Sequence, residues 1–229
     1  MHIPDGFINA TTSLGAGLVS VGGLGFSLRR AKEFLEERRA PLAGLLAAFI
    51  FALQMLNFPV AAGTSGHFMG GLLAAVLVGP WVAVLVMAVV LAMQALLFAD
   101  GGLTALGLNI MNLALIAPLV GWVVFLGVRK VLPSGRNGVV LASGVAAGVS
   151  VLAAAGGFVL QYALGGTGSA AVGTVAGAMA AVHLVIGVGE GVITALAIGA
   201  VMAVRPDLVY GASGVAWAPA PQAAMGEGL

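Results

Sequence analysis

Long apolar runs interrupted by very few charges are the feature that most constrains how this chain folds. Of its 229 residues, 61% are hydrophobic and 7% are charged, whereas a soluble domain carries about 25% charged residues. The runs are continuous, and about 20 apolar residues suffice for one helix to cross a bilayer. Because a β-barrel would need alternating polar and apolar residues, the pattern predicts an all-α, polytopic helical bundle in a membrane.

Seven transmembrane helices are predicted, of which the third is short. Pro80 separates the third from the fourth, and the alternative is one long Pro-kinked helix over 68–98. The positive-inside rule favours seven spans, because with an outer N-terminus all nine Lys and Arg residues then fall on the cytoplasmic side. The C-terminus is then cytoplasmic as well. The predicted spans are 8–28, 41–57, 68–79, 81–98, 103–128, 138–164 and 172–204.

The domain organisation is predicted to be one membrane-embedded domain over 1–204 and a tail over 205–229. The tail is rich in Ala, Pro and Gly after Pro206, and we expect it to be a mobile cytoplasmic segment. The chain has no cysteine, which excludes disulfides and thiolate metal sites, and its net charge of +1 argues against nucleic acid as a partner. Without a G-x-x-x-x-G-K-[ST] loop, it is not expected to hydrolyse ATP.

The first residues, MHIPDGF, carry no basic residue ahead of the first span, so no cleavable export signal is expected. Met1 is expected to persist as the mature N-terminus, because a large residue follows it. The Met1 amine, the His2 amide nitrogen and His2 Nδ1 can then close two adjacent chelate rings on one metal ion. The amide has to lose its proton, and Ni²⁺ and Cu²⁺, which favour tetragonal nitrogen fields, best compensate for that loss.

A fourth nitrogen is available from His67, the only other histidine predicted on the outer side. The PDG turn, with Pro4 at its second position, can fold the N-terminus back toward the loop that precedes this histidine. The glycines of GTSGHFMGG permit close approach of the backbone. These features predict a roughly square-planar site for a divalent metal ion, made by Met1, His2 and His67.

Several polar residues near the outer ends of the spans are interpreted as supports that hold the loop and orient His67. The alternative, of equal weight for each, is that they only join helices, and Asp100 could also cap the fifth span. On the last span, His183 and Glu190 fall with Thr194 on one helical stripe. Both are predicted to make internal polar contacts with a neighbouring helix or a partner protein. The proposed supports are Ser65, Asn57, Gln94, Asp100, Asn109 and Asn112.

Three segments, MHIPDGF at the start, GTSGHFMGG at 63–71 and QALLFADGGLTALGLNIMN at 94–112, resemble the CbiM/NikM family over most of the chain. These proteins are the substrate-binding (S) components of energy-coupling-factor (ECF) transporters for cobalt and nickel. The resemblance implies seven helices, capture of Ni²⁺ or Co²⁺ outside the cytoplasmic (inner) membrane, no prosthetic group, and ligands that match Met1, His2 and His67. It implies a transmembrane T component and two cytoplasmic ATPase subunits as partners. An accessory membrane part that is fused to some relatives would be a separate protein here.

A function from another class is an intramembrane serine protease, because GTSG at 63–66 matches a rhomboid-type G-x-S-G pattern and His183 could be the base. A protease serine lies within hydrogen-bond reach of its base, whereas Ser65 is predicted in an outer loop, and a protease does not explain His2. A self-contained secondary transporter would need charged or broken helices at mid-membrane, and only Glu190 qualifies. The sequence thus favours a metal-capture subunit over an enzyme, and it does not separate nickel from cobalt.

Overall fold

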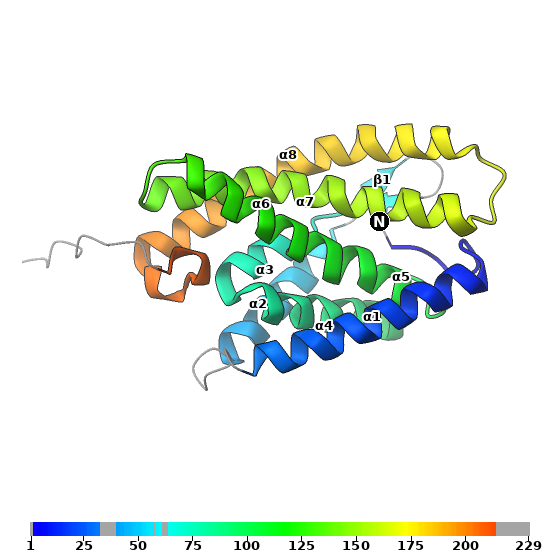
Figure 1. Cartoon of the computed structure of the whole chain (residues 1–229), viewed down its shortest axis with the longest axis horizontal. Coiled ribbons are helices and arrows are strands. Elements are labelled where there is room, and N and C mark those ends of the chain that lie inside the picture. Colours follow the sequence, from blue (N-terminus) through cyan, green and yellow to red (C-terminus); the bar gives the residue numbers. More distant parts are fainter. Residues whose placement is uncertain (1, 33–39, 57, 61–63, 214–229) are drawn as a thin grey trace, which may run out of the picture.

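A computed structural model describes residues 2–32, 40–56, 58–60 and 64–213, which fold into one helical bundle with a single short hairpin (Figure 1). Its elements are α1 (Ala10–Ala31), α2 (Ala40–Gln54), β1 (Phe58–Val60), β2 (Thr64–Gly66), α3 (Gly71–Val78), α4 (Pro80–Phe98), α5 (Leu106–Asn109), the π-helical segment η2 (Ile110–Ile116), α6 (Ala117–Val131), α7 (Arg136–Gly165), α8 (Val172–Val204) and the 3-10 turns η3 (Pro206–Leu208) and η4 (Tyr210–Ala212). The long helices run roughly along one axis, with α7 and α8 together on one flank and α1 and α4 on the other.

Within the described ranges, five helices are long and apolar enough to cross a membrane: α1, α4, the continuous α5–η2–α6 helix, α7 and α8. Helix α2 is a shorter apolar helix of 15 residues. The outer sides of the bundle expose large apolar residues, such as Leu18 on α1 and Val185 on α8, which is typical of surfaces that face lipid. The predicted multi-pass helical membrane protein is therefore confirmed.

The third predicted span is the eight-residue helix α3, which is buried along its whole length. Gly79 ends it with φ +87°, a conformation that favours glycine. Pro80 then starts α4 at a position where its missing N–H does no harm. Because α3 and α4 pack against each other across this break, the alternative of one long helix over 68–98 is wrong.

Glycines let the two longest helices, α7 and α8, approach each other closely. A Cβ atom added to Gly191 would lie 2.7 Å from the carbonyl oxygen of Gly144, and one added to Gly148 would lie 3.1 Å from that of Gly187. Small residues at such crossings are how helices in lipid associate. This contact fixes α8, and with it the polar side chains that α8 points into the bundle.

The chain beyond α8 begins as part of the packed body. Val209 and Ala212 are buried against the bundle, and Arg129 of α6 donates a hydrogen bond to the Gly211 carbonyl at 2.8 Å. The first part of the segment predicted as a tail is thus packed, because the apolar residues that follow α8 find a buried surface. Residues 214–229 lie outside the described part of the chain.

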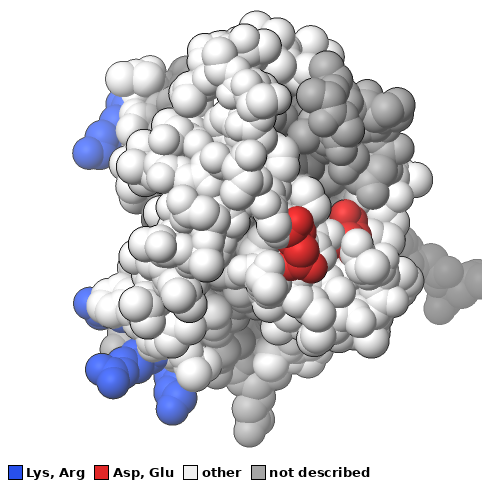
Figure 2. All heavy atoms as spheres, turned by 90° about the vertical axis from the view of Figure 1, so that its right-hand side faces the viewer, with Lys and Arg blue, Asp and Glu red and all other residues white. Residues whose placement is uncertain are grey.

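Charge divides the bundle along its length. The described Lys and Arg residues lie at the C-terminal ends of α1, α6 and α8 and at the start of α7, which meet at one end of the molecule. The opposite end, seen in Figure 2, shows carboxylates near its centre and Lys and Arg only at its edge. The carboxylates that the structure describes on this side are Asp5, which is exposed, and Asp100, which is partly buried.

Candidate metal centre

The N-terminal segment enters the bundle instead of lying on its surface. A turn over Pro4–Phe7 is closed by the Phe7 N–H, which donates to the Pro4 carbonyl. The sequence predicted Pro4 at the second position of this turn, but Pro4 is its first residue. Gly6 takes the third position, where φ is positive (+74°). Ile3, on the inner side of the turn, is fully buried.

The α4–α5 connection and α5 hold this segment in place. Asn109 pairs with the main chain of Ile3, accepting its N–H at 2.8 Å and donating to its carbonyl at 3.2 Å. The Gly102 N–H donates to the same carbonyl at 2.9 Å. Asp5 accepts from the hydroxyl and the amide of Thr104, and these bonds lower the pKa of the Asp5 carboxyl below its usual range. Five hydrogen bonds, three to the main chain of Ile3 and two to the side chain of Asp5, thus hold the segment next to the second residue of the chain.

His67 is carried by the connection between β2 and α3. β1 and β2 pair as an antiparallel hairpin with Phe58 opposite Gly66, and the chain then turns inward before α3 begins. His67 Nδ1 lies 2.8 Å from the Phe68 carbonyl oxygen. Since a carbonyl can only accept a hydrogen bond, Nδ1 carries the proton and Nε2 keeps the lone pair.

Burial keeps the His67 ring neutral. Burial is the main reason that the pKa of His67 lies well below its ordinary 6.5, and the imidazoles of His2 and His183 lower it further. Nε2 is buried and has no hydrogen-bond partner among the residues that the structure describes. His67 therefore presents a neutral imidazole with an unused lone pair.

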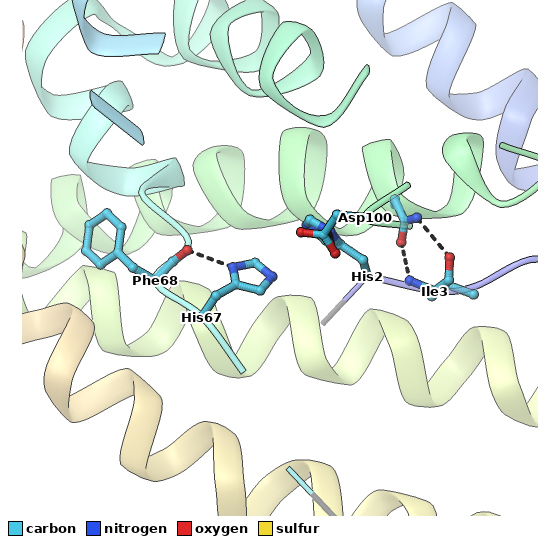
Figure 3. Close-up of polar contacts among 6 residues, drawn as sticks. His2, Ile3, His67, Phe68 and Asp100 are labelled. Atoms are coloured by element: carbon cyan, nitrogen blue, oxygen red, sulfur yellow. Dashed lines mark hydrogen bonds and ion pairs between the residues drawn. The ribbon is translucent and has the colours of Figure 1, made fainter. Parts of the chain in front are cut away.

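The rings of His2 and His67 lie next to each other, with centroids 4.6 Å apart and planes at 60° (Figure 3). His2 Nδ1 lies 2.9 Å from Oδ1 of Asp100. His2 Nε2, like that of His67, is buried and lacks a hydrogen-bond partner within the described ranges. Buried polar atoms normally have partners, so two adjacent imidazoles with unused nitrogens fit a ligand that accepts lone pairs, as a divalent metal ion does.

Two of the residues predicted to orient His67 support the N-terminal side of the site instead. Asp100 lies against the His2 ring, and it does not cap the next helix, because Ala105 is the residue before α5. Asn109 holds the main chain of a residue 106 positions away, in the N-terminal segment. Nothing local in the sequence indicates pairings over such a separation.

The remaining predicted supports lie around the site in different roles. Gln94 is fully buried on α4, and neither atom of its amide has a hydrogen-bond partner in the described segments. Asn112 exchanges two hydrogen bonds with Gln161 of α7, at 2.8 and 3.0 Å, so it joins helices. Ser65 lies in strand β2. Two predicted site residues, Met1 and Asn57, fall outside the described residues.

The polar stripe of α8 faces the interior of the bundle, with each of its three members at most 2% exposed. Glu190 accepts the Met69 N–H at 2.8 Å and the Gly70 N–H at 2.7 Å, which ties α8 to the segment leading into α3. His183 Nδ1 donates to the Met179 carbonyl of its own helix at 2.8 Å. The sequence indicated that Glu190 makes an internal contact, but it did not indicate with which segment.

Side chains alone do not form a metal site in the part of the chain that is described. No group of three or more His, Cys, Asp or Glu side chains there is arranged to hold a metal ion. A site built on His2 and His67 therefore needs further donors besides His, Cys, Asp and Glu side chains of the described residues.

Comparisons with known proteins agree with one another. The family described as CbiM, cobalt uptake substrate-specific transmembrane region, matches residues 2–208. A putative metal transport protein of Haloquadratum walsbyi is 40% identical over 92% of this chain and 94% of its own length. A putative fused nickel transport protein NikMN of Archaeoglobus fulgidus is 37% identical over 91% of this chain and 68% of its own length. A crystal structure of a transition metal transporter superposes with a TM-score of 0.82 at 31% identity, covering 89% of this chain and 93% of its own.

Proposed function

Because the chain belongs to the CbiM family of cobalt-uptake transmembrane proteins, we propose that it is the substrate-capture (S) subunit of an energy-coupling-factor importer for Ni²⁺ or Co²⁺. The family is one of transport proteins and not of enzymes, so the serine-protease alternative, which required Ser65 and His183, is set aside. One observation supports the site most strongly. The buried rings of His2 and His67 lie 4.6 Å apart, and Nε2 of His67, the proposed ligand atom of that ring, has no hydrogen-bond partner among the described residues.

In the proposed site, the transported ion is held by four nitrogens: the Met1 amine, the His2 amide and imidazole, and the His67 imidazole. Chelation with the amide uses His2 Nδ1, so this ring has to turn Nδ1 away from Asp100, which is 2.9 Å from it in the structure. His67 needs no such change, because the Phe68 carbonyl already holds its Nδ1–H. An outer hydrogen bond of this kind fixes the tautomer and orientation of a metal-binding histidine.

The ligand set ranks the two candidate ions. Nitrogen ligands in one plane, one of them an ionised amide, suit the tetragonal preference of Ni²⁺, and the general affinity order also places Ni²⁺ above Co²⁺. We therefore expect tighter binding of Ni²⁺. Which ion is carried in the cell depends also on metal supply and on partners.

We propose that the metal site faces outward from the cytoplasmic (inner) membrane. The described Lys and Arg residues gather at the opposite end of the bundle (Figures 1 and 2), and basic residues favour the cytoplasmic side. The sequence contains no phosphate-binding loop for ATP. Inward release of a tightly bound ion therefore calls for a transmembrane T component and two cytoplasmic ATPase subunits.

Binding of Ni²⁺ to the purified protein is expected to weaken with acidification below about pH 8, because the amine, with an ordinary pKa of about 7.7–8.0, and the amide both give up protons to the site. Burial holds the pKa of His67 well below 6.5, so this ring contributes little to the competition near neutral pH. If Ni²⁺ binding releases one proton, each unit by which the pH falls lowers the affinity about tenfold. If binding releases two protons, each unit lowers the affinity about 100-fold. Calorimetry in buffers of different ionisation enthalpy measures both the affinity and the number of protons released.

The same titration can also contradict the proposed site. An affinity that stays within about threefold from pH 8 to pH 6 is incompatible with a site that deprotonates an amine and an amide. Carrying out the titration with Co²⁺ in parallel ranks the two ions under identical conditions.

A further inference from the structure

We propose that Glu190 is a positioning residue for the metal site: from α8, its carboxylate fixes the peptide groups that determine where His67 lies. This inference rests on the proposed function. Both carboxylate oxygens are engaged, Oε2 by the Met69 N–H at 2.8 Å and Oε1 by the Gly70 N–H at 2.7 Å. The side chain is only 2% exposed, and a carboxylate removed from water is retained only with hydrogen-bond partners of this kind.

One planar peptide group connects the carboxylate to the imidazole. The Met69 N–H that Glu190 accepts belongs to the same peptide as the Phe68 carbonyl, and that carbonyl accepts the His67 Nδ1–H at 2.8 Å. Because a peptide is rigid, a shift of its N–H edge moves its carbonyl edge and with it the ring. Hydrogen bonds in such a series also polarise one another, as in the carboxylate–histidine pairs that orient metal ligands.

The segment after His67 is held by α2 on one side and by α8 on the other. On the α8 side, the hydrogen bonds of Glu190 hold it more than side-chain packing does. Gln54 of α2 donates to the Met69 carbonyl at 2.6 Å. Between α2 and α8 lies an apolar groove of about 630 Å³, with Phe68 and Glu190 among its lining residues. Packing there leaves room for the segment to move. The carboxylate therefore holds this segment against α8.

The substitution Glu190→Gln tests this role. It replaces one acceptor oxygen by an amide NH₂, which cannot accept from the peptide N–H that it faces. We expect the Kd for Ni²⁺ to rise about 10–100-fold, the range for losing an outer partner of a metal ligand. Glu190→Asp keeps a carboxylate on a shorter arm and should recover part of the affinity. The matched control is Thr194→Val, because Thr194 is buried one turn further on the same face and its hydroxyl has no hydrogen-bond partner in the described chain.

The measurements are Ni²⁺ calorimetry on the full-length, detergent-purified variants, hydrogen exchange of residues 67–71, and thermal unfolding without metal. The expected result is weaker binding and faster exchange in Glu190→Gln, partial recovery in Glu190→Asp, and wild-type behaviour in Thr194→Val. Wild-type affinity in Glu190→Gln, or an equal loss in Thr194→Val, overturns the positioning role. If Glu190→Gln does not fold, Glu190→Asp decides the question: faster exchange of residues 67–71 with unchanged Ni²⁺ affinity overturns the positioning role. A wild-type protein that binds no Ni²⁺ overturns the proposed function itself, and the two failures are thereby distinguished.

Discussion

Replacing His67 with glutamine is expected to raise the Kd for Ni²⁺ by more than about 100-fold, beyond the range for losing an outer partner of a ligand. The substitution removes the fourth nitrogen of the proposed plane, and an amide NH₂ has no basic lone pair to replace it. His67 Nε2 has no hydrogen-bond partner among the described residues, so the metal-free protein should unfold at nearly the wild-type temperature. Calorimetry gives the affinity, and unfolding with and without Ni²⁺ shows whether the stabilisation by metal is lost.

His183→Gln is the matched control for this substitution. His183 is as buried as His67, its Nδ1 also donates to a main-chain carbonyl at 2.8 Å, and its Nε2 also lacks a partner in the described chain. Because His183 is not a proposed ligand, its replacement by glutamine should change the Ni²⁺ affinity by less than about threefold. This is far below the change expected on losing a ligand or the outer partner of a ligand. Equal losses in the two variants would mean that a buried imidazole, and not a ligand, had been removed.

The second large effect is expected from Gly102→Ala. A Cβ atom at this position would lie 2.3 Å from the main-chain nitrogen of Asp5 and 2.8 Å from its Cα, so the N-terminal segment would have to move away from the α4–α5 connection. The Gly102 N–H bond to the Ile3 carbonyl would be lost with it. Overpacking of this kind destabilises by about 1–3 kcal/mol. We expect a lower unfolding temperature and, because His2 is displaced, a rise of about 10–100-fold in the Kd for Ni²⁺.

Gly22→Ala provides the comparison for this change. Gly22 lies in α1 with nothing within 4 Å of an added Cβ, and alanine is the better helix former. Its affinity and unfolding temperature should be those of the wild type or slightly higher. If Gly102→Ala behaved in the same way, the N-terminal segment would not be seated as the structure describes.

The helices were largely predictable, because apolar length and helix-breaking residues are local properties of the sequence. The span predicted over 81–98 is α4 (Pro80–Phe98), and the break before it falls at Gly79, where φ is positive. The π-helical segment η2 was expected only as part of the span over 103–128, and the pairing of its Asn112 with Gln161, 49 positions away, was not predicted. The hairpin of β1 and β2 was expected only as a loop, since each strand has three residues.

At the proposed site, the two histidines could be singled out from the sequence, but the contacts that hold them could not. The two histidines stand out because of coordination chemistry: one follows the N-terminal residue, and the other is the remaining histidine on the same side. The contacts that hold them join Asn109 to Ile3 and Glu190 to Met69, over 106 and 121 positions. Only the packed bundle brings such residues together. For the same reason, Asn109 was expected beside His67 and lies instead at the N-terminal segment.

The most direct test of the proposed site is Ni²⁺ binding by the protein with Met1 as its free N-terminus, compared with the same protein carrying two extra residues ahead of Met1. The control carries these residues after Leu229 instead. If the amine and the second amide are ligands, the N-terminal extension removes the amine from its chelating position, and tight binding is lost while the control binds as the wild type does. Equal Ni²⁺ affinity in all three proteins would contradict a site formed by the N-terminus.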